Sequence, residues 1–160
     1  MTIQVGDRLP EATLATMTPD GPDQVQVPDT FAGKKVALFC VPGAFTPTCS
    51  ARHLPGFVEK ADELKAKGVD QIVGLAVNDV FVMDAWGRSS NVGDKVTLLA
   101  DGNGAFVKAM GLELDASGFG MGIRGKRFSM VVNDGVVEQL NVEEGGEFRV
   151  SSADHLLASL

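Results

Sequence analysis

Two continuous apolar runs, separated by a segment of helical periodicity, constrain the fold of this chain most strongly. The runs are Lys35–Val41 (KVALFCV) and Val69–Val77 (VDQIVGLAV). Strands that are apolar on both faces are typical of parallel sheets covered by helices. The helical segment between them ends near Gly68, and Pro55 is predicted to kink or divide it. A strand, helix, strand order predicts a right-handed parallel unit, with the first run in the middle of the sheet.

Shorter signals predict the other elements. Turn residues, helix-capping residues and β-rich runs alternate along the remainder of the chain. The Asp-Gly pair near the C-terminal end is the clearest hairpin signal. In chain order, the predicted elements are an N-terminal hairpin of Ala12–Met17 and Gln24–Val27, a helix capped by Asn78 or Asp79, a strand Val96–Ala100, a helix Ala105–Met110, a glycine-rich loop to about Lys126, a hairpin of Arg127–Val132 and Val136–Val142, and a last helix capped by Ser152.

The order of these elements predicts the fold class. It is βαβ, an inserted segment, then ββα, which is the connectivity of a thioredoxin-like fold. We therefore expect an α/β protein with a central mixed β-sheet flanked by helices, an N-terminal hairpin and an inserted segment. The 160 residues, 44% hydrophobic and 22% charged, fit a single domain spanning residues 1–160.

Charge and cysteine content restrict the partners and the compartment. A net charge of −7 argues against nucleic acid or an anionic membrane as the main partner. No apolar run is long enough to span a bilayer, and Met1–Pro10 predicts neither a signal peptide nor a transit peptide. With only Cys40 and Cys49, a structural disulfide framework is not expected. A reducing, cytoplasmic setting follows.

The segment after the first apolar run places a cysteine at the start of a helix. Thr46 suits the N-cap, Pro47 then takes the first helical position, and Cys49 falls at the third. Unpaired backbone N–H groups and the helix dipole lower a thiol pKa there. The sequence therefore predicts a nucleophilic thiolate at Cys49.

In thioredoxin-like proteins a redox Cys-x-x-Cys opens this helix, but here the four positions are Thr46, Pro47, Thr48 and Cys49. A site with one cysteine cannot close a local disulfide. A single-thiol nucleophile is favoured over a dithiol oxidoreductase.

The chain resembles a known family in these residues and in several distant blocks. With PGAFTPTCS at Pro42–Ser50, it is similar to the type II, peroxiredoxin-5-like peroxiredoxins over nearly its whole length. The other matching blocks are RHLPGF (Arg52–Phe57), VNDVFVMDAW (Val77–Trp86), LADGNGAF (Leu99–Phe106), KRFSMVVNDG (Lys126–Gly135) and GGEFRVSSADHLL (Gly145–Leu157).

The resemblance implies a thiol peroxidase that needs neither a metal nor a cofactor. Cys49 would be the peroxidatic cysteine that attacks hydrogen peroxide or an organic hydroperoxide. Thr46 would hydrogen-bond the thiolate and the peroxide, and Pro42 would shield the sulfur from water. Arg127 would stabilise the negative charge, and the backbone N–H of Thr48 would contribute to substrate binding.

The resemblance also bears on how the enzyme is recycled. Some relatives carry a second, resolving cysteine, but the corresponding positions here are Gly74 and Val150. We expect a one-cysteine mechanism in which glutathione or glutaredoxin reduces the sulfenic acid, and thioredoxin is less favoured. Similar proteins form homodimers through the face that carries the active-site loops. The alternative function is thiol–disulfide exchange or peroxide sensing through mixed disulfides.

Several residues have a structural reading beside the functional one. Cys40 fits core packing, with a disulfide to Cys49 as the alternative. His53 fits a packed or solvated side chain, with a thiolate–imidazolium pair as the alternative. Arg127 could instead form a surface salt bridge. Gly120–Gly125 matches the dinucleotide pattern GxGxxG but precedes a strand, so a nucleotide role is not favoured.

Two further patterns have a simple reading. Phe81, Met83 and Trp86 form an apolar stripe that we assign to the core, or in part to a dimer contact. Cys40, Cys49 and His53 match no compact zinc-binding spacing.

Overall fold

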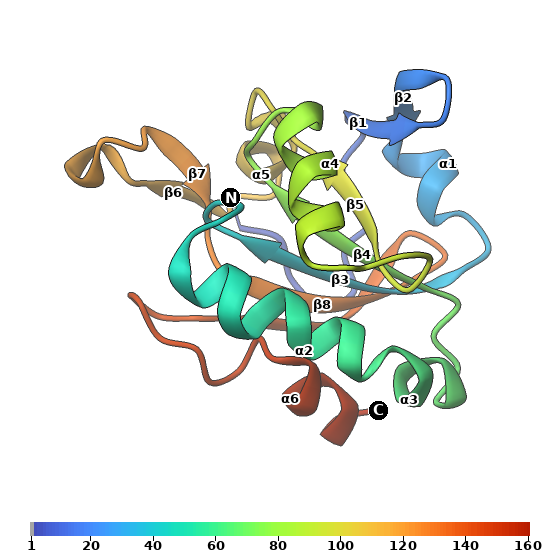
Figure 1. The fold of residues 1–160 in the computed structure, drawn as a ribbon. Helices are drawn as coiled ribbons and strands as arrows, with labels where there is room; N and C mark the ends of the chain where they lie inside the picture. Colours follow the sequence, from blue (N-terminus) through green and yellow to red (C-terminus); the bar gives the residue numbers. More distant parts are fainter. Residues whose placement is uncertain (1) are drawn as a thin grey trace.

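A seven-stranded mixed sheet forms the centre of the protein (Figure 1). The structure is a computed structural model that describes residues 2–160, with the backbone alone at Cys49. The order across the sheet is β2-β1-β5-β4-β3-β8-β9. The strands are β1 (Thr13–Thr18), β2 (Gly21–Gln26), β3 (Lys35–Val41), β4 (Gln71–Ala76), β5 (Thr97–Ala100), β8 (Phe128–Asn133) and β9 (Val136–Val142).

The sheet has three parallel strands at its centre and an antiparallel pair of strands on each side, β1 and β2 beside β5, and β8 and β9 beside β3. Strands β3, β4 and β5 are parallel neighbours, whereas β8 runs antiparallel to both β3 and β9. Strand β3 is interior, with its residues from Val36 to Val41 buried. The predicted thioredoxin-like α/β fold with a central mixed sheet is confirmed, as is the interior place of the first apolar run.

Helices cover both faces of this sheet. Alternate residues of β3 point to two different apolar clusters: Cys40 belongs to one, and Phe39 and Val41 to the other. The first cluster also contains residues of α1 and α5, and the second contains residues of α2, α3, α4 and α6. The helices are α1 (Val27–Phe31), α2 (Leu54–Glu59), α3 (Ala61–Ala66), α4 (Val80–Ser89), α5 (Ala105–Ala109) and α6 (Ala153–Ala158), with a π-helical turn η1 (Cys49–His53) and a 3₁₀ turn η2 (Ser117–Phe119).

Local capping chemistry sets several helix ends as predicted. The carboxylate of Asp79 accepts a hydrogen bond from the N–H of Val82 at 2.9 Å, and the Ser152 hydroxyl accepts one from His155 at 3.1 Å. Gly68 adopts φ = +98° after α3, a conformation that disfavours other residues. None of the helices in residues 2–160 is both long and apolar enough to cross a membrane.

The predicted glycine-rich loop before Lys126 is wrong. This segment forms a two-stranded hairpin of β6 (Glu113–Asp115) and β7 (Ile123–Gly125), which projects to one side of the molecule in Figure 1. Gly120 and Gly122 have φ of +71° and +69°, which the turn between the strands requires. Strands of three residues are too short to show an alternating pattern, so sequence periodicity could not reveal them.

Two other expectations need correction. The N-terminal hairpin is confirmed, but its second strand ends at Gln26, and Val27 begins the unpredicted helix α1. In the stripe on α4, Met83 and Trp86 are buried, whereas Phe81 is 65% exposed. Residues two apart on a helix point in nearly opposite directions, so Phe81 cannot share the buried face with Met83.

Candidate active site

A short loop follows β3 and leads into the helix that begins beside Cys49. Pro42 is half-buried at the end of the strand. The backbone N–H of Ala44 donates to the Asn78 side-chain oxygen at 2.9 Å, which ties this loop to the segment after β4. Phe45 adopts the left-handed conformation at φ = +65°, and the Thr46 hydroxyl donates to the carbonyl of Gly43 at 2.7 Å. The loop is therefore fixed at the carboxyl end of two parallel strands.

Arg124 links this loop to the β6–β7 hairpin. Its Nε donates to the Met121 carbonyl at 2.9 Å, and its Nη1 donates to the carbonyls of Val77 at 3.3 Å and Pro42 at 3.5 Å. A Cβ atom added at Gly43 would lie 3.2 Å from Nη1 of Arg124, so glycine permits this close approach. Sequence reasoning missed Arg124, which lies inside the GxGxxG match. That match spans β7 and opens no helix, so its context is not that of a dinucleotide-binding motif.

The helix after the loop begins where the sequence predicts. Pro47 is the first helical residue, and the N–H of Ser50 donates to the Thr46 carbonyl at 3.0 Å. Thr48 is half-buried in the same turn. The side chain of Cys49 lies outside the part of the chain that the structure describes, but its backbone opens the π-helical turn η1.

Pro55 accounts for this wide turn. Proline has no N–H, and in an α-helix its ring would clash with the carbonyl four residues earlier. The π-helical turn ends at His53, and α2 then starts with Pro55 in its first turn. The helical segment changes from a π-helical to an α-helical turn just before Pro55, but it is divided at Lys60, between α2 and α3, and not at Pro55. The same turn directs His53 inward, where it is 1% exposed.

Both ring nitrogens of His53 have partners. Nε2 lies 2.9 Å from the Ser151 carbonyl, and Nδ1 lies 2.9 Å from Nη1 of Arg127. A carbonyl only accepts and a guanidinium only donates, so Nε2 carries the proton and Nδ1 accepts. Burial, followed by the charge of Arg127, lowers the His53 pKa to about 3. The imidazole is thus neutral, which confirms a packed histidine and disfavours a thiolate–imidazolium pair.

Arg127 lies beside the turn that contains Cys49. Antiparallel pairing of Phe128 with Cys40 brings Arg127 to the carboxyl end of β3. Its guanidinium contacts His53, in the η1 turn, and its Cζ lies 5.9 Å from the centroid of the Phe148 ring. These contacts place the cation of Arg127 against the η1 turn.

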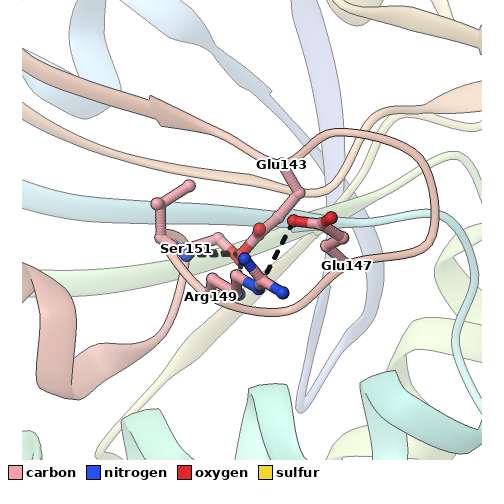
Figure 2. Close-up of polar contacts among 5 residues, drawn as sticks. Glu143, Glu147, Arg149 and Ser151 are labelled. Atoms are coloured by element: carbon pink, nitrogen blue, oxygen red, sulfur yellow. Dashed lines mark hydrogen bonds and ion pairs between the residues drawn. The ribbon is translucent and has the colours of Figure 1, made fainter.

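A buried carboxylate organises the loop after β9. One oxygen of Glu143 accepts the backbone N–H groups of Arg149, Val150 and Ser151, each at 2.8 Å, and the Ser151 hydroxyl at 2.6 Å (Figure 2). Burial raises the pKa of Glu143, but the hydrogen bonds outweigh it and the net shift is downward. Sequence reasoning missed Glu143, which belongs to no local motif, and it missed the role of Ser151, although Ser151 lies within the block Gly145–Leu157.

Cys40 packs in the core as predicted. Its side chain is fully buried, and a Cβ atom added at Gly125 would lie 2.7 Å from its sulfur. Cys40 belongs to the cluster on the α5 face, whereas Leu54 and Phe57 of α2 belong to the cluster on the opposite face. Helix α2 therefore covers the face of the sheet away from Cys40.

Gly74 and Val150, the two positions at which the resemblance would lead one to look for a resolving cysteine, differ in the space they offer. A Cβ atom at Gly74 would lie 2.7 Å from Cδ2 of Leu98 and 2.8 Å from Cζ of Phe39. Val150 is half-buried in the loop held by Glu143.

Among the side chains that the structure describes, no group of three His, Cys, Asp or Glu could hold a metal ion.

Comparison with known proteins identifies the family. The Redoxin family model matches residues 4–157. Peroxiredoxin-2B of Arabidopsis thaliana is 52% identical over 161 residues, covering 99% of this chain and 98% of the relative, and the chloroplastic peroxiredoxin-2E of the same plant is 50% identical over 99% of this chain and 70% of its own length. The structure of reduced Prx3 from Vibrio vulnificus in complex with H2O2 superposes with a TM-score of 0.95 at 52% identity, covering 99% of both chains. The chain therefore belongs to the Redoxin family, and within it to the type II peroxiredoxins, which are thiol peroxidases.

Proposed function

We propose that Cys49 is the peroxidatic nucleophile of this enzyme and that its substrates are hydrogen peroxide and organic hydroperoxides. The thiolate attacks the terminal peroxide oxygen, so an S–O bond forms as the O–O bond breaks. The water or alcohol that leaves takes up a proton, and the sulfur becomes a sulfenic acid. The observation that carries the proposal is that Arg127 contacts His53 in the same η1 turn that begins with Cys49.

The neighbouring residues have matching roles in this proposal. The Thr46 hydroxyl already donates to Gly43, so its oxygen is oriented to accept a hydrogen bond from the peroxide. Arg127 stabilises the thiolate and the charge that develops on the leaving oxygen. Pro42 shields the sulfur from water, and the backbone N–H of Thr48 supplies a further donor at the helix start.

The recycling step in this proposal uses one cysteine of the enzyme. A glutathione or glutaredoxin thiolate attacks the sulfenic sulfur, water leaves, and a second thiol reduces the mixed disulfide. Two observations support this route: a side chain at Gly74 would collide with its neighbours, and Val150 carries no thiol.

The proposed assembly is a homodimer in a reducing cytoplasmic setting. Exposed apolar side chains on the active-site loop, α4 and the hairpin support the dimer, namely Phe45 (53%), Phe81 (65%), Phe119 (86%) and Ile123 (39%). Their segments are in contact, because the Ala44 N–H binds Asn78 and Arg124 of the hairpin donates to the Pro42 carbonyl. Sedimentation of wild type and of Phe81→Ser tests this proposal. If wild type sediments as a monomer, as the variant does, the proposed dimer is contradicted.

Peroxide turnover with separate reductants tests the proposed function. Cys49→Ser is expected to lose peroxide consumption, whereas the matched variant Cys40→Ser retains it. Glutathione, glutaredoxin and thioredoxin are supplied one at a time, and glutathione or glutaredoxin is expected to sustain turnover. Retained turnover in Cys49→Ser contradicts the assignment, and turnover with thioredoxin alone contradicts the recycling route. Reaction of Cys49 with disulfides but not with peroxide supports the exchange or sensing function instead.

A further inference from the structure

A closed circuit of hydrogen bonds links a buried carboxylate to the arginine beside the active site. The N–H of Glu143 donates to the Arg127 carbonyl at 3.0 Å, and the Glu143 carboxylate accepts from the N–H and hydroxyl of Ser151. The Ser151 carbonyl accepts from Nε2 of His53, and Nδ1 of His53 accepts from the guanidinium of Arg127. The circuit thus begins at the backbone of Arg127 and ends at its side chain.

The carboxylate is the organising group of this circuit. The segment from Glu144 to Ser151 contains no helix or strand. A single oxygen of Glu143 gathers three consecutive backbone N–H groups and one hydroxyl of this segment (Figure 2). Charge-assisted hydrogen bonds of this kind are shorter and stronger than neutral ones. Their effect is to fix the direction of the Ser151 carbonyl.

The direction of that carbonyl determines what His53 can do. A carbonyl at Nε2 requires a proton on that nitrogen, which leaves Nδ1 as an acceptor aimed at Arg127. Phe148, from the same segment, lies edge-on to the His53 ring with 5.1 Å between centroids and near the Arg127 guanidinium. The segment held by Glu143 therefore contacts both the imidazole and the guanidinium.

We infer that Glu143 is a positioning residue for Arg127, acting through Ser151 and His53. The inference rests on the proposed function only in that Arg127 is taken to serve the thiolate of Cys49. The Glu143 carboxylate accepts hydrogen bonds from the loop that it holds, through the N–H groups of Arg149, Val150 and Ser151 and the Ser151 hydroxyl. A purely structural anchor would hold the loop without affecting the thiol, and this difference can be measured.

The test compares Glu143→Gln with Glu144→Gln, an adjacent exposed residue that undergoes the same change of charge. Two quantities are measured: the pKa of the Cys49 thiol from the pH dependence of alkylation in a Cys40→Ser background, and the rate constant for oxidation by hydrogen peroxide. Glu143→Gln is expected to raise the thiol pKa and to slow oxidation by about tenfold, as small misplacements of a catalytic group do. Glu144→Gln is expected to match wild type in both.

A double-mutant cycle with Arg127→Met shows whether the effect passes through the arginine. In that background, Glu143→Gln is expected to slow oxidation no further. If the two substitutions slow oxidation independently of each other, the inference is overturned. It is also overturned if Glu143→Gln lowers the stability of the protein but keeps the wild-type thiol pKa and oxidation rate.

His53→Phe provides a second route if Glu143→Gln does not fold. His53→Phe removes the hydrogen bonds of both ring nitrogens and leaves the hydrogen bonds to Glu143 in place. The same rise in the pKa of the Cys49 thiol is expected. An unchanged thiol pKa in His53→Phe overturns the inference. Failure of wild-type Cys49 to react with peroxide would instead contradict the proposed function, while the alkylation measurement would still report on the positioning of Arg127.

Discussion

The indole N–H of Trp86, on α4, donates a 3.0 Å hydrogen bond to the hydroxyl of Ser50, the residue that follows Cys49. Trp86 is the single tryptophan of the chain and is 1% exposed. A buried indole N–H without an acceptor is costly, so this bond couples α4 to the η1 turn.

Ser50→Ala is expected to lower the free energy of unfolding by about 1–3 kcal/mol, because it leaves the Trp86 N–H unsatisfied. Urea denaturation followed by circular dichroism measures this change. Ser89→Ala, at an exposed position at the end of α4, is the control and is expected to stay within about 0.5 kcal/mol of wild type. Equal losses in the two variants would show that the bond contributes nothing.

Acid is expected to destabilise the fold through His53. Its pKa in the folded state is about 3, below the ordinary value of 6.5, so between these values the unfolded chain binds the proton and the folded chain does not. The contribution of His53 to the free energy of unfolding is therefore fully present above pH 6.5. It is lost as the pH falls towards 3, by at most about 1.4 kcal/mol per pH unit. Urea denaturation from pH 7.5 to 4.5 should show a shallower slope for His53→Phe, and parallel slopes would contradict the shift.

The downward pKa shift of Glu143 acts in the same direction but at lower pH. A carboxylate with a lowered pKa stabilises the fold above its unfolded-state pKa, and this contribution is lost as pH falls through its folded-state pKa. Glu143→Gln should therefore change the pH dependence of the free energy of unfolding only below the ordinary pKa of a glutamate. His53→Phe should change it from pH 6.5 downward.

Gly125→Ala is expected to cost about 1–3 kcal/mol of stability by overpacking. The added Cβ would lie 2.7 Å from the sulfur of Cys40 and 3.1 Å from Cγ1 of Val107. Removing the sulfur should relieve most of the strain, so Gly125→Ala combined with Cys40→Ala should lose less than the sum of the single variants. Thermal and urea denaturation of all four proteins completes the cycle, and strict additivity would rule out the contact.

Arg124→Met is expected to loosen the β6–β7 hairpin from the active-site loop and to lower stability by about 1–2 kcal/mol. The variant loses the bonds to the carbonyls of Met121, Val77 and Pro42. Hydrogen exchange should accelerate at the amides of Ile123–Gly125. Arg88→Met is the control. The Arg88 side chain is 77% exposed and its ion-pair partner, Asp84, lies on the same helix, so little change is expected. Unaltered exchange in Arg124→Met would contradict the link.

The predicted parts of this fold have local causes. Strand β3, its parallel neighbour β4 and the caps at Asp79 and Ser152 follow from apolar runs and short-range hydrogen bonding, which a sequence displays directly. The β6–β7 hairpin was missed because each of its strands has three residues, and its register depends on bonds between positions about ten residues apart.

The candidate site divides in the same way. The helix start at Pro47 follows from residues adjacent in the chain. The surroundings of His53 do not, because its two ring partners, Arg127 and Ser151, lie 74 and 98 positions away. Only the tertiary fold brings the η1 turn to the residue before β8 and to the loop after β9, and no periodicity or short motif encodes these contacts.

The crowding around Gly74 limits how this protein could evolve. A change of this glycine to cysteine by itself would drive the new side chain into Phe39 and Leu98, so the folding cost would arrive before any benefit from a second thiol. Smaller residues at those two positions would have to come first, and each would leave a void in the core on its own. A lineage that starts from this sequence would thus have to pass through less stable variants before it could form an internal disulfide at this strand.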